Sequence, residues 1–390
     1  MRKFLLGTLT VILAISLLSF SQLRDNYFEI TRNLDIFGTL FKELNTNYVD
    51  EVDPEELIVE GINAMLSSLD PYTNFIPESE LESYRTQTTG EYGGIGATVE
   101  TKNGLSTVIM PFVGFPAHIA GLEIGDNILQ IDGKDLAGRS STEVSDLLKG
   151  NPNTTLQLKV KRFGNNETFE LVVERAKIVI SNVTYSGMYD TEVGYIRLSE
   201  FTTNASKEVT KSINQLKDAG AKSIILDLRG NPGGLLSEAI NVANIFIPKG
   251  NEIVNTKGKS ESVAQVYKAL QNAEEPNMPL AVLTSNGSAS ASEIVSGAIQ
   301  DYDRGILVGK KTFGKGLVQG TRPLPYDAQL KLTTAKYYIP SGRCIQAIDY
   351  SHRNSDGSVG KIPDSLKVAF KTKNGRTVYD GGGIDPDIEV

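Results

Sequence analysis

Cysteine, histidine and tryptophan are scarce in this chain, which has one, two and none of them among its 390 residues. The single cysteine, Cys344, excludes an internal disulfide framework and a cysteine-rich zinc site, and we expect it to be a small, half-buried residue. Neither His118 nor His352 lies near a serine motif with recognisable spacing. A catalytic triad built on histidine is therefore disfavoured, and we expect His118 on the surface.

Positive charge is also scarce, and it is not clustered. The formal net charge is -8 and no dense run of Lys and Arg occurs. Phosphate binding needs such clusters, so nucleic acid is not expected as a partner. No motif implies a metal or an organic cofactor. The length allows two or three domains, each with its own core.

The one long uncharged run lies at the N-terminus, where Arg2 and Lys3 precede residues 4–20. This pattern predicts an export signal within residues 1–24. The run is slightly short for a spanning helix of about 20 residues, and no clear cleavage site follows it. A cleaved signal peptide and a retained membrane anchor both remain open. In either case we expect the remainder in a periplasm or the cell envelope.

Residues 25–88 form a predicted N-terminal helical region. Apolar residues recur at helical intervals from about Asn26 to Tyr84, for example at Phe37, Leu40 and Leu44. Asp53, followed by proline and two glutamates, is typical of a helix start. The amphipathic segment is expected to pack either on a second copy of the chain, giving a homo-oligomer, or on its own domain.

Two further regions follow, which makes the predicted fold a multidomain α/β one. Residues 89–175 read as short strands and turns with one helix, Ser141 to Leu148, and an alternating strand from Leu156 to Arg162. Residues 176–390 alternate apolar strands with helices. The strands are expected at 193–198, 223–228 and 280–284, and the helices at 206–219, 235–246 and 290–301. Continuous apolar strands between helices predict a largely parallel sheet buried on both faces.

A candidate nucleophile and base lie within 30 residues of each other. Ser290 falls where the strand at 280–284 gives way to a helix, and Lys315 is flanked by glycines. A serine hydroxyl needs a neighbouring group to take its proton, and an amine does so when burial destabilises its ammonium form. Ser288 and Ser292 compete with Ser290, and composition does not choose among them.

Backbone amides at two strand-to-helix corners are candidate oxyanion donors. Unpaired N–H groups of a first helical turn point outward, and we expect the Ala291 amide to serve. The second donor is expected from Gly233, with Gly234 as the alternative. Gln319 lies four residues after Lys315; in a straight strand the two are about 13 Å apart, so contact requires the backbone to fold at Gly316.

Several ordered motifs resemble those of the carboxy-terminal processing proteases, peptidase family S41. They are Tyr92–Ala97, Pro116–Leu122 with Gly125-Asp126, Leu226–Gly234, Ser288–Glu293, Phe313–Gly316 and Tyr338–Arg343. The resemblance spans about residues 30 to 388 and implies a serine peptidase core with a ClpP/crotonase-like fold. It implies Ser290 as nucleophile, Lys315 as general base and Gln319 as the residue that orients the base. It also implies the amides of Ala291 and Gly233 as oxyanion donors.

The middle region resembles a PDZ domain, whose ligand is a protein C-terminus. Converging N–H groups of Ile95, Gly96 and Ala97 are expected to bind a terminal carboxylate while the peptide pairs with the following strand. Val144 and Leu148 share a helical face and are expected to bound a pocket for the last apolar side chain.

Two other functions are alternatives to an exported endopeptidase. A catalytically inactive PDZ adaptor or sensor would be expected to lose Ser290, Lys315 or Gln319, and this chain keeps all three. An enoyl-hydratase-like enzyme is disfavoured, because this chain has no acidic pair in a suitable motif and carries the PDZ-like insertion. If the protease interpretation holds, the PDZ domain is expected to cover the catalytic cleft until a peptide C-terminus draws it aside.

Overall fold

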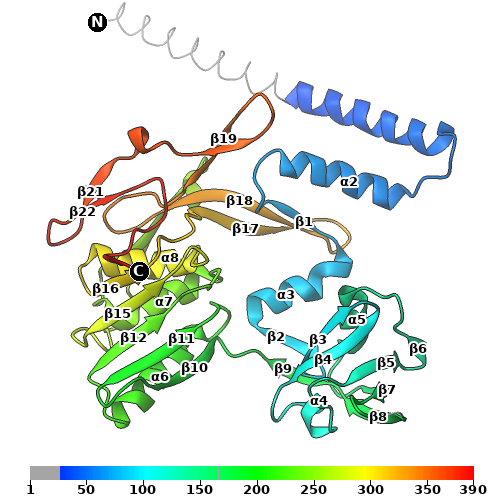
Figure 1. The fold of residues 1–390 in the computed structure, drawn as a ribbon. Helices are drawn as coiled ribbons and strands as arrows, with labels where there is room; N and C mark the ends of the chain where they lie inside the picture. Colours follow the sequence, from blue (N-terminus) through cyan, green and yellow to red (C-terminus); the bar gives the residue numbers. More distant parts are fainter. Residues whose placement is uncertain (1–26, 166) are drawn as a thin grey trace, which may run out of the picture. The chain divides into compact units, whose positions relative to one another are not determined.

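A computed structural model describes residues 27–165 and 167–390 of the chain (Figure 1). The chain divides into two compact units, one ending at Ser68 and the other running from Leu69 to Val390. The predicted export signal at residues 1–24 lies outside the described residues. No helix in the described part of the chain is both long and apolar enough to cross a membrane.

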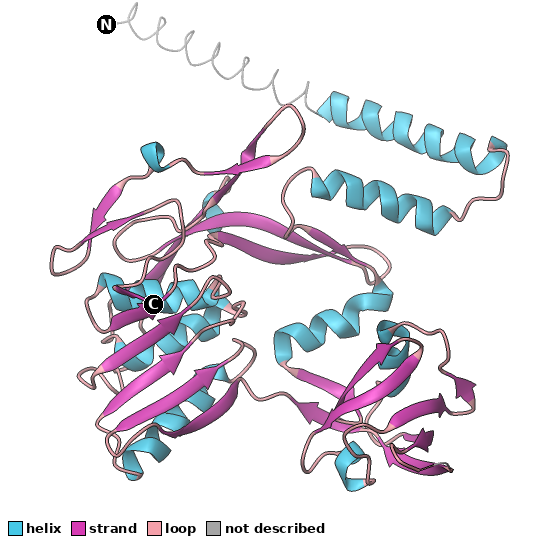
Figure 2. Cartoon of the chain, in the orientation of Figure 1, coloured by secondary structure: helices cyan, strands magenta, loops and turns pink. Residues whose placement is uncertain are grey.

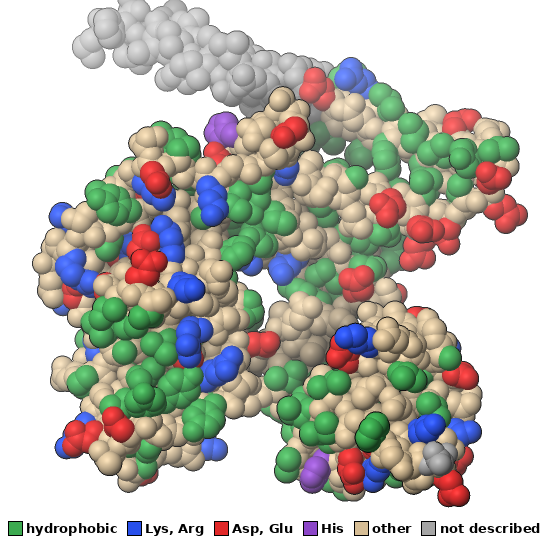
Figure 3. Space-filling view, viewed as in Figure 1, with side chains coloured by type: hydrophobic (Ala, Val, Ile, Leu, Met, Phe, Trp, Pro, Cys, Tyr) green, Lys and Arg blue, Asp and Glu red, His purple; other side chains and the backbone are tan. Residues whose placement is uncertain are grey.

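The first unit consists of helices, as predicted. Residues 27–47 are helical, and α2 spans Pro54–Ser67. The Asp53 carboxylate accepts hydrogen bonds from the backbone amides of Glu55 and Glu56, which caps α2 as its sequence predicts. No residue of α2 is buried, and hydrophobic side chains are prominent along these helices in Figure 3. The exposed apolar residues include Phe28, Leu34, Phe37, Leu40, Tyr48 and Met65.

The predicted helical pattern is wrong between Leu69 and Glu80. This stretch contains a turn, the strand β1 (Asn74–Ile76) and a short 3-10 helix (Glu78–Glu80), after which α3 spans Leu81–Thr89. The Asp70 carboxylate accepts from the backbone amides of Tyr72 and Thr73, 2.8 and 2.9 Å away. Such side-chain bonds to the local backbone compete with helix formation. As a result, β1 pairs with the distant strand β18.

The region expected to resemble a PDZ domain is a small β-rich unit with its own core. Its main sheet has the order β3-β4-β5-β7-β8, with β6 on β5, and β2 pairs with β9. The strands are β2 (Glu91–Gly94), β3 (Ala97–Lys102), β4 (Leu105–Pro111), β5 (Asn127–Ile131), β6 (Lys134–Asp135), β7 (Thr155–Lys161), β8 (Thr168–Glu174) and β9 (Ala176–Val179). The helices are α4 (Pro116–Ile119) and α5 (Ser141–Leu148), the latter with the predicted bounds.

The second half of the chain is built on a six-stranded sheet with the order β10-β11-β12-β15-β16-β23. The strands from β11 to β23 are parallel, and β10 is an antiparallel edge. Their bounds are β10 (Val183–Met188), β11 (Val193–Leu198), β12 (Ser223–Asp227), β15 (Leu280–Thr284), β16 (Ile306–Gly309) and β23 (Ile388–Glu389). The predicted largely parallel sheet is confirmed.

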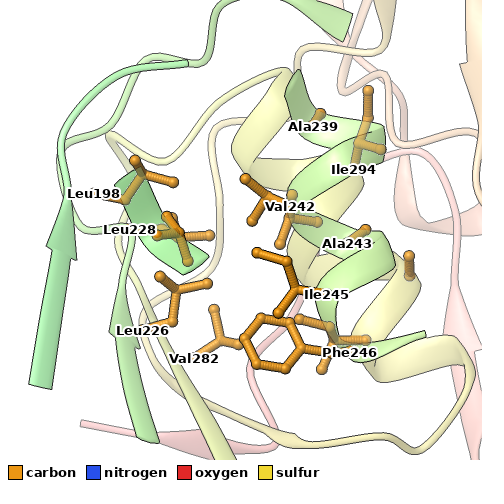
Figure 4. Packing of buried hydrophobic residues seen from close by; sticks show 14 of the residues in the cluster. Leu198, Leu226, Leu228, Ala239, Val242, Ala243, Ile245, Phe246, Val282 and Ile294 are labelled. Atoms are coloured by element: carbon orange, nitrogen blue, oxygen red, sulfur yellow. The ribbon is translucent and has the colours of Figure 1, made fainter. Parts of the chain in front are cut away.

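Helices α6 (Ala205–Asp218), α7 (Leu236–Phe246) and α8 (Ala291–Asp301) lie behind this sheet in Figure 1. The packing in Figure 4 brings Val242 and Phe246 of α7 against Leu226 and Val282 of the strands. The expectation of two buried faces is wrong, because alternate strand residues such as Tyr195 and Ile225 are only half-buried. The strands therefore bury one face fully and the other in part.

A second sheet has five strands, drawn in magenta with the others in Figure 2. It contains β1, β18 (Gln329–Tyr338), β13 (Glu252–Lys257) and β14 (Gln265–Lys268) in that order, with β17 (Leu317–Pro323) also paired with β18. The remaining strands form two hairpins, β19 (Ile348–Arg353) with β20 (Val359–Lys361) and β21 (Ala369–Lys371) with β22 (Thr377–Tyr379). Short 3-10 turns lie at Glu261–Val263 and Asp364–Leu366.

Candidate active site

Ser290 occupies the N-cap of α8, at the corner where β15 ends. Its backbone has φ 55° and ψ -110°, a conformation that costs a non-glycine residue about 1–3 kcal/mol. The surrounding structure holds it there: the Ser290 amide donates to Oε2 of Glu293 at 2.9 Å, and its carbonyl accepts from the amides of Glu293 and Ile294. Strain of this kind clusters at functional sites, so the corner is a candidate site.

The two competing serines have structural roles. Ser288 donates from Oγ to the carbonyl of Leu228 at 2.7 Å, and Ser292 donates from Oγ to the carbonyl of Asn231 at 3.0 Å. Both are fully buried. Ser290 is the serine of the three whose side chain makes no such bond to the backbone, and it faces the hydroxyl of Tyr337. The geometry therefore favours Ser290 as the candidate nucleophile, whereas the composition of the serine-rich run did not distinguish the three serines.

Asn231 links the two strand-to-helix corners. Its side-chain nitrogen donates to the carbonyl of Leu198 at 2.8 Å, and its own carbonyl accepts from the amide of Ala289 at 3.0 Å. Gly233, two residues on, lies directly against the nucleophile corner. A Cβ at Gly233 would lie 2.9 Å from the Ser290 Cβ and 2.9 Å from the Ala291 amide nitrogen. The turn after β12 thus needs glycine here, both for space and for its φ of 103°.

The two predicted oxyanion donors differ in their present hydrogen bonding. Within the described residues, the Ala291 amide donates no hydrogen bond, as expected of a first helical turn. The Gly233 amide instead donates to Oδ1 of Asn231 at 2.9 Å. Gly234, the alternative, packs on Phe201, whose carbonyl oxygen would lie 2.4 Å from an added Cβ. The Ala291 amide is therefore open to a ligand, whereas the neighbouring Gly233 amide is already bound to Asn231.

Lys315 lies just before β17, in a loop held closely against residues 346–347. A Cβ on Gly314 would lie 2.4 Å from the Cβ of Ala347, and one on Gly316 would lie 2.6 Å from the amide nitrogen of Gln346. The Gly316 amide donates to Oε1 of Gln346 at 2.7 Å. The glycines on either side of Lys315 therefore permit the close approach that the sequence indicated.

Glu293 connects the serine corner to the lysine loop. Its carboxylate is fully buried and accepts from the amides of Ser290, Gly314 and Lys315 and from the hydroxyl of Thr312, at 2.9, 2.7, 2.8 and 2.6 Å. Burial raises the pKa of the Glu293 carboxyl, and the four donors oppose that rise. The Glu293 carboxylate therefore holds the backbone at Ser290 and the backbone of the Lys315 loop at the same time.

The environment of Lys315 favours the neutral amine. Burial lowers its pKa to about 8, and the positive charge of Lys331 acts in the same direction, while Glu293 and Asp70 oppose it. The Lys315 Nζ lies 4.3 Å from the centre of the Tyr72 ring. A lysine with this pKa can accept a proton near neutral pH, as a general base must.

Among the described residues, the side chains of the predicted triad are not hydrogen-bonded to one another. Within the described residues, no hydrogen bond joins Lys315 Nζ to Ser290 or to Gln319. Gln319 lies on β17 and its side-chain nitrogen donates to Oγ1 of Thr333 at 3.2 Å. In this arrangement the side chain of Gln319 therefore does not bind Lys315.

The proposed peptide groove has a small pocket of about 80 Å³. Its lining includes three of the predicted positions, Ile95, Ala97 and Leu148. The amides of Ile95 and Gly96 donate no hydrogen bond within the described residues, so both are open to a carboxylate. Val144 does not line the pocket, and it packs in the core of the domain together with Ile95 and Leu148. The pocket is completed by Tyr92, Val99, Ser145 and Lys149.

Sequence reasoning missed three residues of the site: Glu293, Tyr337 and Tyr72. A serine followed three residues later by glutamate is a capping-box pattern and was a readable signal for Glu293. The Asp-Pro pair before Tyr72 is a turn signal. No local pattern indicates Tyr337, which is brought to Ser290 by β18. Burial raises the pKa of Tyr337 to about 12, so its hydroxyl stays neutral, and the contact with Ser290 opposes that rise.

Cys344 is partly buried and His118 lies on the surface, as the sequence predicted. Burial raises the pKa of the Cys344 thiol, so it is not a reactive thiolate. His118 and His352 are exposed. Among the described residues, no group of three His, Cys, Asp or Glu side chains is arranged to hold a metal ion.

Comparison with known proteins identifies the class. A family model for peptidase family S41 matches residues 192–352, and one for the PDZ domain matches residues 113–162. The carboxy-terminal-processing protease of Bartonella bacilliformis is 37% identical over 353 residues, covering 89% of this chain and 81% of that protein. The carboxy-terminal processing protease CtpA of Bacillus subtilis is 34% identical over 357 residues, covering 91% and 74%. Among solved structures, the photosystem II D1 C-terminal processing protease is 27% identical with a TM-score of 0.47, covering 90% of this chain and 86% of that one.

The chain is therefore a serine-type peptidase that carries a PDZ domain. It belongs to the carboxy-terminal-processing proteases of family S41. The predicted family, enzyme class and fold class are confirmed.

Proposed function

We propose that this peptidase acts through a Ser290/Lys315 dyad, with Gln319 orienting Lys315 in the active arrangement. The observation that carries the proposal is the strained Ser290 at the mouth of α8, beside the open Ala291 amide and next to a loop holding a lysine with a lowered pKa. These are a nucleophile, an oxyanion donor and a base.

The chemistry proceeds in two stages. Ser290 Oγ bonds to the carbonyl carbon of the substrate while its proton passes to the neutral Lys315 amine, and the oxyanion accepts from the Ala291 and Gly233 amides. The C–N bond then breaks and Lys315 returns the proton to the leaving nitrogen. Water then attacks the acyl carbon while its proton passes to Lys315, the ester C–O bond breaks, and Lys315 returns that proton to Ser290 Oγ, which restores the hydroxyl and the neutral amine. Before the first step, Lys315 must leave the Tyr72 ring and Gly233 must release Asn231.

The PDZ domain is proposed to bind the substrate C-terminus. The open amides of Ile95 and Gly96 would bind the carboxylate, and the pocket beside Ala97 and Leu148 would take the last side chain. Binding there is proposed to draw the domain from the catalytic cleft. Deletion of residues 92–174 tests this: gating requires a changed peptidase rate, and an unaltered rate contradicts it.

The dyad is tested by Ser290→Ala and Lys315→Ala, each assayed on an unstructured polypeptide with fragments followed by mass. We expect both variants to lose cleavage while thermal unfolding shows them folded. Lys311→Ala is the matched control, because its side chain pairs with Asp385 on the exposed surface and it should cleave normally. Full activity in either dyad variant would refute the assignment.

Export and assembly are further proposals. Arg2 and Lys3 before the uncharged residues 4–20 support export to a periplasm or cell envelope, with removal of residues 1–24 or retention as an anchor. Fractionation of cells and N-terminal sequencing of the mature protein separate these outcomes. Exposed Phe37 and Leu40, on a unit with no buried helix residue in α2, support a homo-oligomer through the N-terminal helices. Replacing both by Asp should give a monomer by light scattering.

A further inference from the structure

Tyr72 lies in the turn between α2 and β1, and this turn is bound to the distant strand β18. Asp70, buried at 7% exposure, fixes the turn, and Thr73 Oγ1 accepts from the backbone amide of Thr333 in β18 at 3.1 Å. The next residue, Asn74, pairs with Lys331 in the same strand. On its other side Tyr72 meets the ring of Tyr350 edge to face, with centroids 6.1 Å apart. The ring is fixed in place.

The face of this fixed ring is directed at the candidate base. Lys315 Nζ lies 4.3 Å from the ring centre, within the 6 Å range of a cation–π contact. Burial and the hydrogen bond with Tyr350 raise the pKa of Tyr72, so the phenol stays neutral and the contact is with a ring, not a phenolate. A ring quadrupole attracts an ammonium but not a neutral amine. The contact therefore favours the protonated side chain.

The charges that face Lys315 come from three other places. Lys331 on β18 repels the ammonium, whereas Glu293 on α8 and Asp70 in the turn attract it. The carboxylate of Glu293 is committed to backbone donors, and that of Asp70 to the amides and hydroxyl of its own turn. No hydrogen bond from Lys315 Nζ to either carboxylate occurs within the described residues. The Tyr72 ring is thus the direct contact of this amine.

We propose that Tyr72 is a positioning residue for Lys315, whose ring face holds the protonated side chain away from Ser290 and releases it once the proton is lost to solvent. This rests on the proposed role of Lys315 as the base. Deprotonation and movement toward Ser290 then become one coupled event, since the amine that can accept the serine proton is the form the ring does not retain.

The test compares Tyr72→Leu, which keeps an apolar wall without a ring face, with Tyr72→Phe, which keeps the ring and loses the hydroxyl. In a Ser290→Ala background, the pH dependence of Lys315 acylation by a small amine-reactive reagent, resolved by peptide mass, reports the pKa of this one amine. We expect the Leu change to lower that pKa by about 0.4–1.5 units and the Phe change to leave it in place. Tyr72→Met serves as a second ring-free variant if Tyr72→Leu fails to fold.

With Ser290 restored, the Leu variant should show a kcat/KM about 3- to 30-fold higher than the parent at pH values below the Lys315 pKa. Tyr72→Phe should restore the parental pH profile. Identical labelling profiles in the parent, Leu and Phe proteins would overturn the proposal, and so would a higher pKa in the Leu variant, which would mean that the ring only excludes water. If the labelling shift occurs but Lys315→Ala still cleaves substrate, the ring contact stands and the dyad assignment fails.

Discussion

Ser290 and Lys315 share one hydrogen-bond acceptor: both backbone amides donate to Oε2 of Glu293, at 2.9 and 2.8 Å. Two segments 25 positions apart in the sequence are thereby fixed to the same atom. Because that carboxylate is fully buried, the two candidate catalytic backbones keep their spacing whatever the side chain of Lys315 does.

Glu293→Gln should therefore impair both the fold and the reaction. Each carboxylate oxygen of Glu293 accepts two hydrogen bonds, whereas the side-chain nitrogen of Gln cannot accept any. Two of the four donors would therefore face another donor, which should lower the free energy of unfolding by about 1–3 kcal/mol. We expect at least a tenfold fall in kcat. Glu143→Gln is the matched control, since Glu143 caps α5 through Ser140 from an exposed position and should change stability by less than about 0.5 kcal/mol. Equal effects of the two substitutions, measured by denaturant unfolding and peptidase rate, would contradict this account.

The peptidase rate should rise with pH through about 8. Lys315 accepts a proton only as the neutral amine, and burial first, then Lys331, lowers its pKa to about 8. The rate measured as kcat/KM on an unstructured substrate should thus increase roughly tenfold per pH unit below this value. A profile that stays flat between pH 6 and 9 would exclude Lys315 as the base.

Stability should also depend on this lysine. Between about pH 8 and the ordinary pKa of 10.5 the unfolded chain binds a proton that the folded chain does not, so the free energy of unfolding rises with pH across that window. Lys315→Met removes the cost of burying this charge. At pH 7 the Met variant should therefore have a free energy of unfolding roughly 1–2 kcal/mol higher than that of the parent, allowing for the partial exposure of Lys315. Urea unfolding at pH 7 and pH 10 measures the difference. A destabilised Met variant at pH 7 would show that burial does not penalise this charge.

Gly233→Ala should block the site and not merely strain a turn. The new Cβ would lie 2.7 Å from the carbonyl oxygen of Ala289 and 2.9 Å from the open Ala291 amide. We expect a loss of at least tenfold in kcat. Gly230→Ala, in the same turn, also has a positive φ, 74°, but its added Cβ would meet nothing within 4 Å. It should lose only stability, by about 1 kcal/mol. Comparable losses of kcat in the two folded variants would remove Gly233 from the site.

Ala97→Leu should weaken peptide binding by filling the pocket of about 80 Å³. Thr98→Leu is its control, since Thr98 points to the opposite, exposed side of β3. Calorimetry with a peptide ending in a small apolar residue should show at least a tenfold higher Kd for the first change and little effect of the second. Amidation of the peptide C-terminus should also abolish binding. Unchanged binding in Ala97→Leu would place the groove elsewhere.

The sequence predicted best the elements whose signals are local. The strand ending at Thr284 and the helix beginning at Ala291 were expected within a residue of their bounds, because an apolar run, a serine-rich turn and a helical pattern follow in order. The strand at Asn74–Ile76 was missed because helical apolar spacing continues across it, and its pairing with β18 is a contact over more than 250 residues. Tyr337 was missed because β18 brings it to Ser290 only in the folded protein, and the turn signal before Tyr72 does not indicate which residue its ring contacts.

The sequence alone could not distinguish the candidate nucleophile from the two neighbouring serines. Ser288, Ser290 and Ser292 are chemically alike and evenly spaced. What separates them is the use of each hydroxyl: two donate to the carbonyls of Leu228 and Asn231, and one is left beside an open amide. That difference arises from how two distant corners meet, and no local pattern encodes it.

Every residue of α8 from Ala291 to Asp301 is buried. The helix that begins directly after Ser290 therefore cannot shift without disturbing the packed interior of the domain. Lys315, in contrast, lies in a loop before β17 and is only partly buried, so its side chain can change rotamer without unpacking the core.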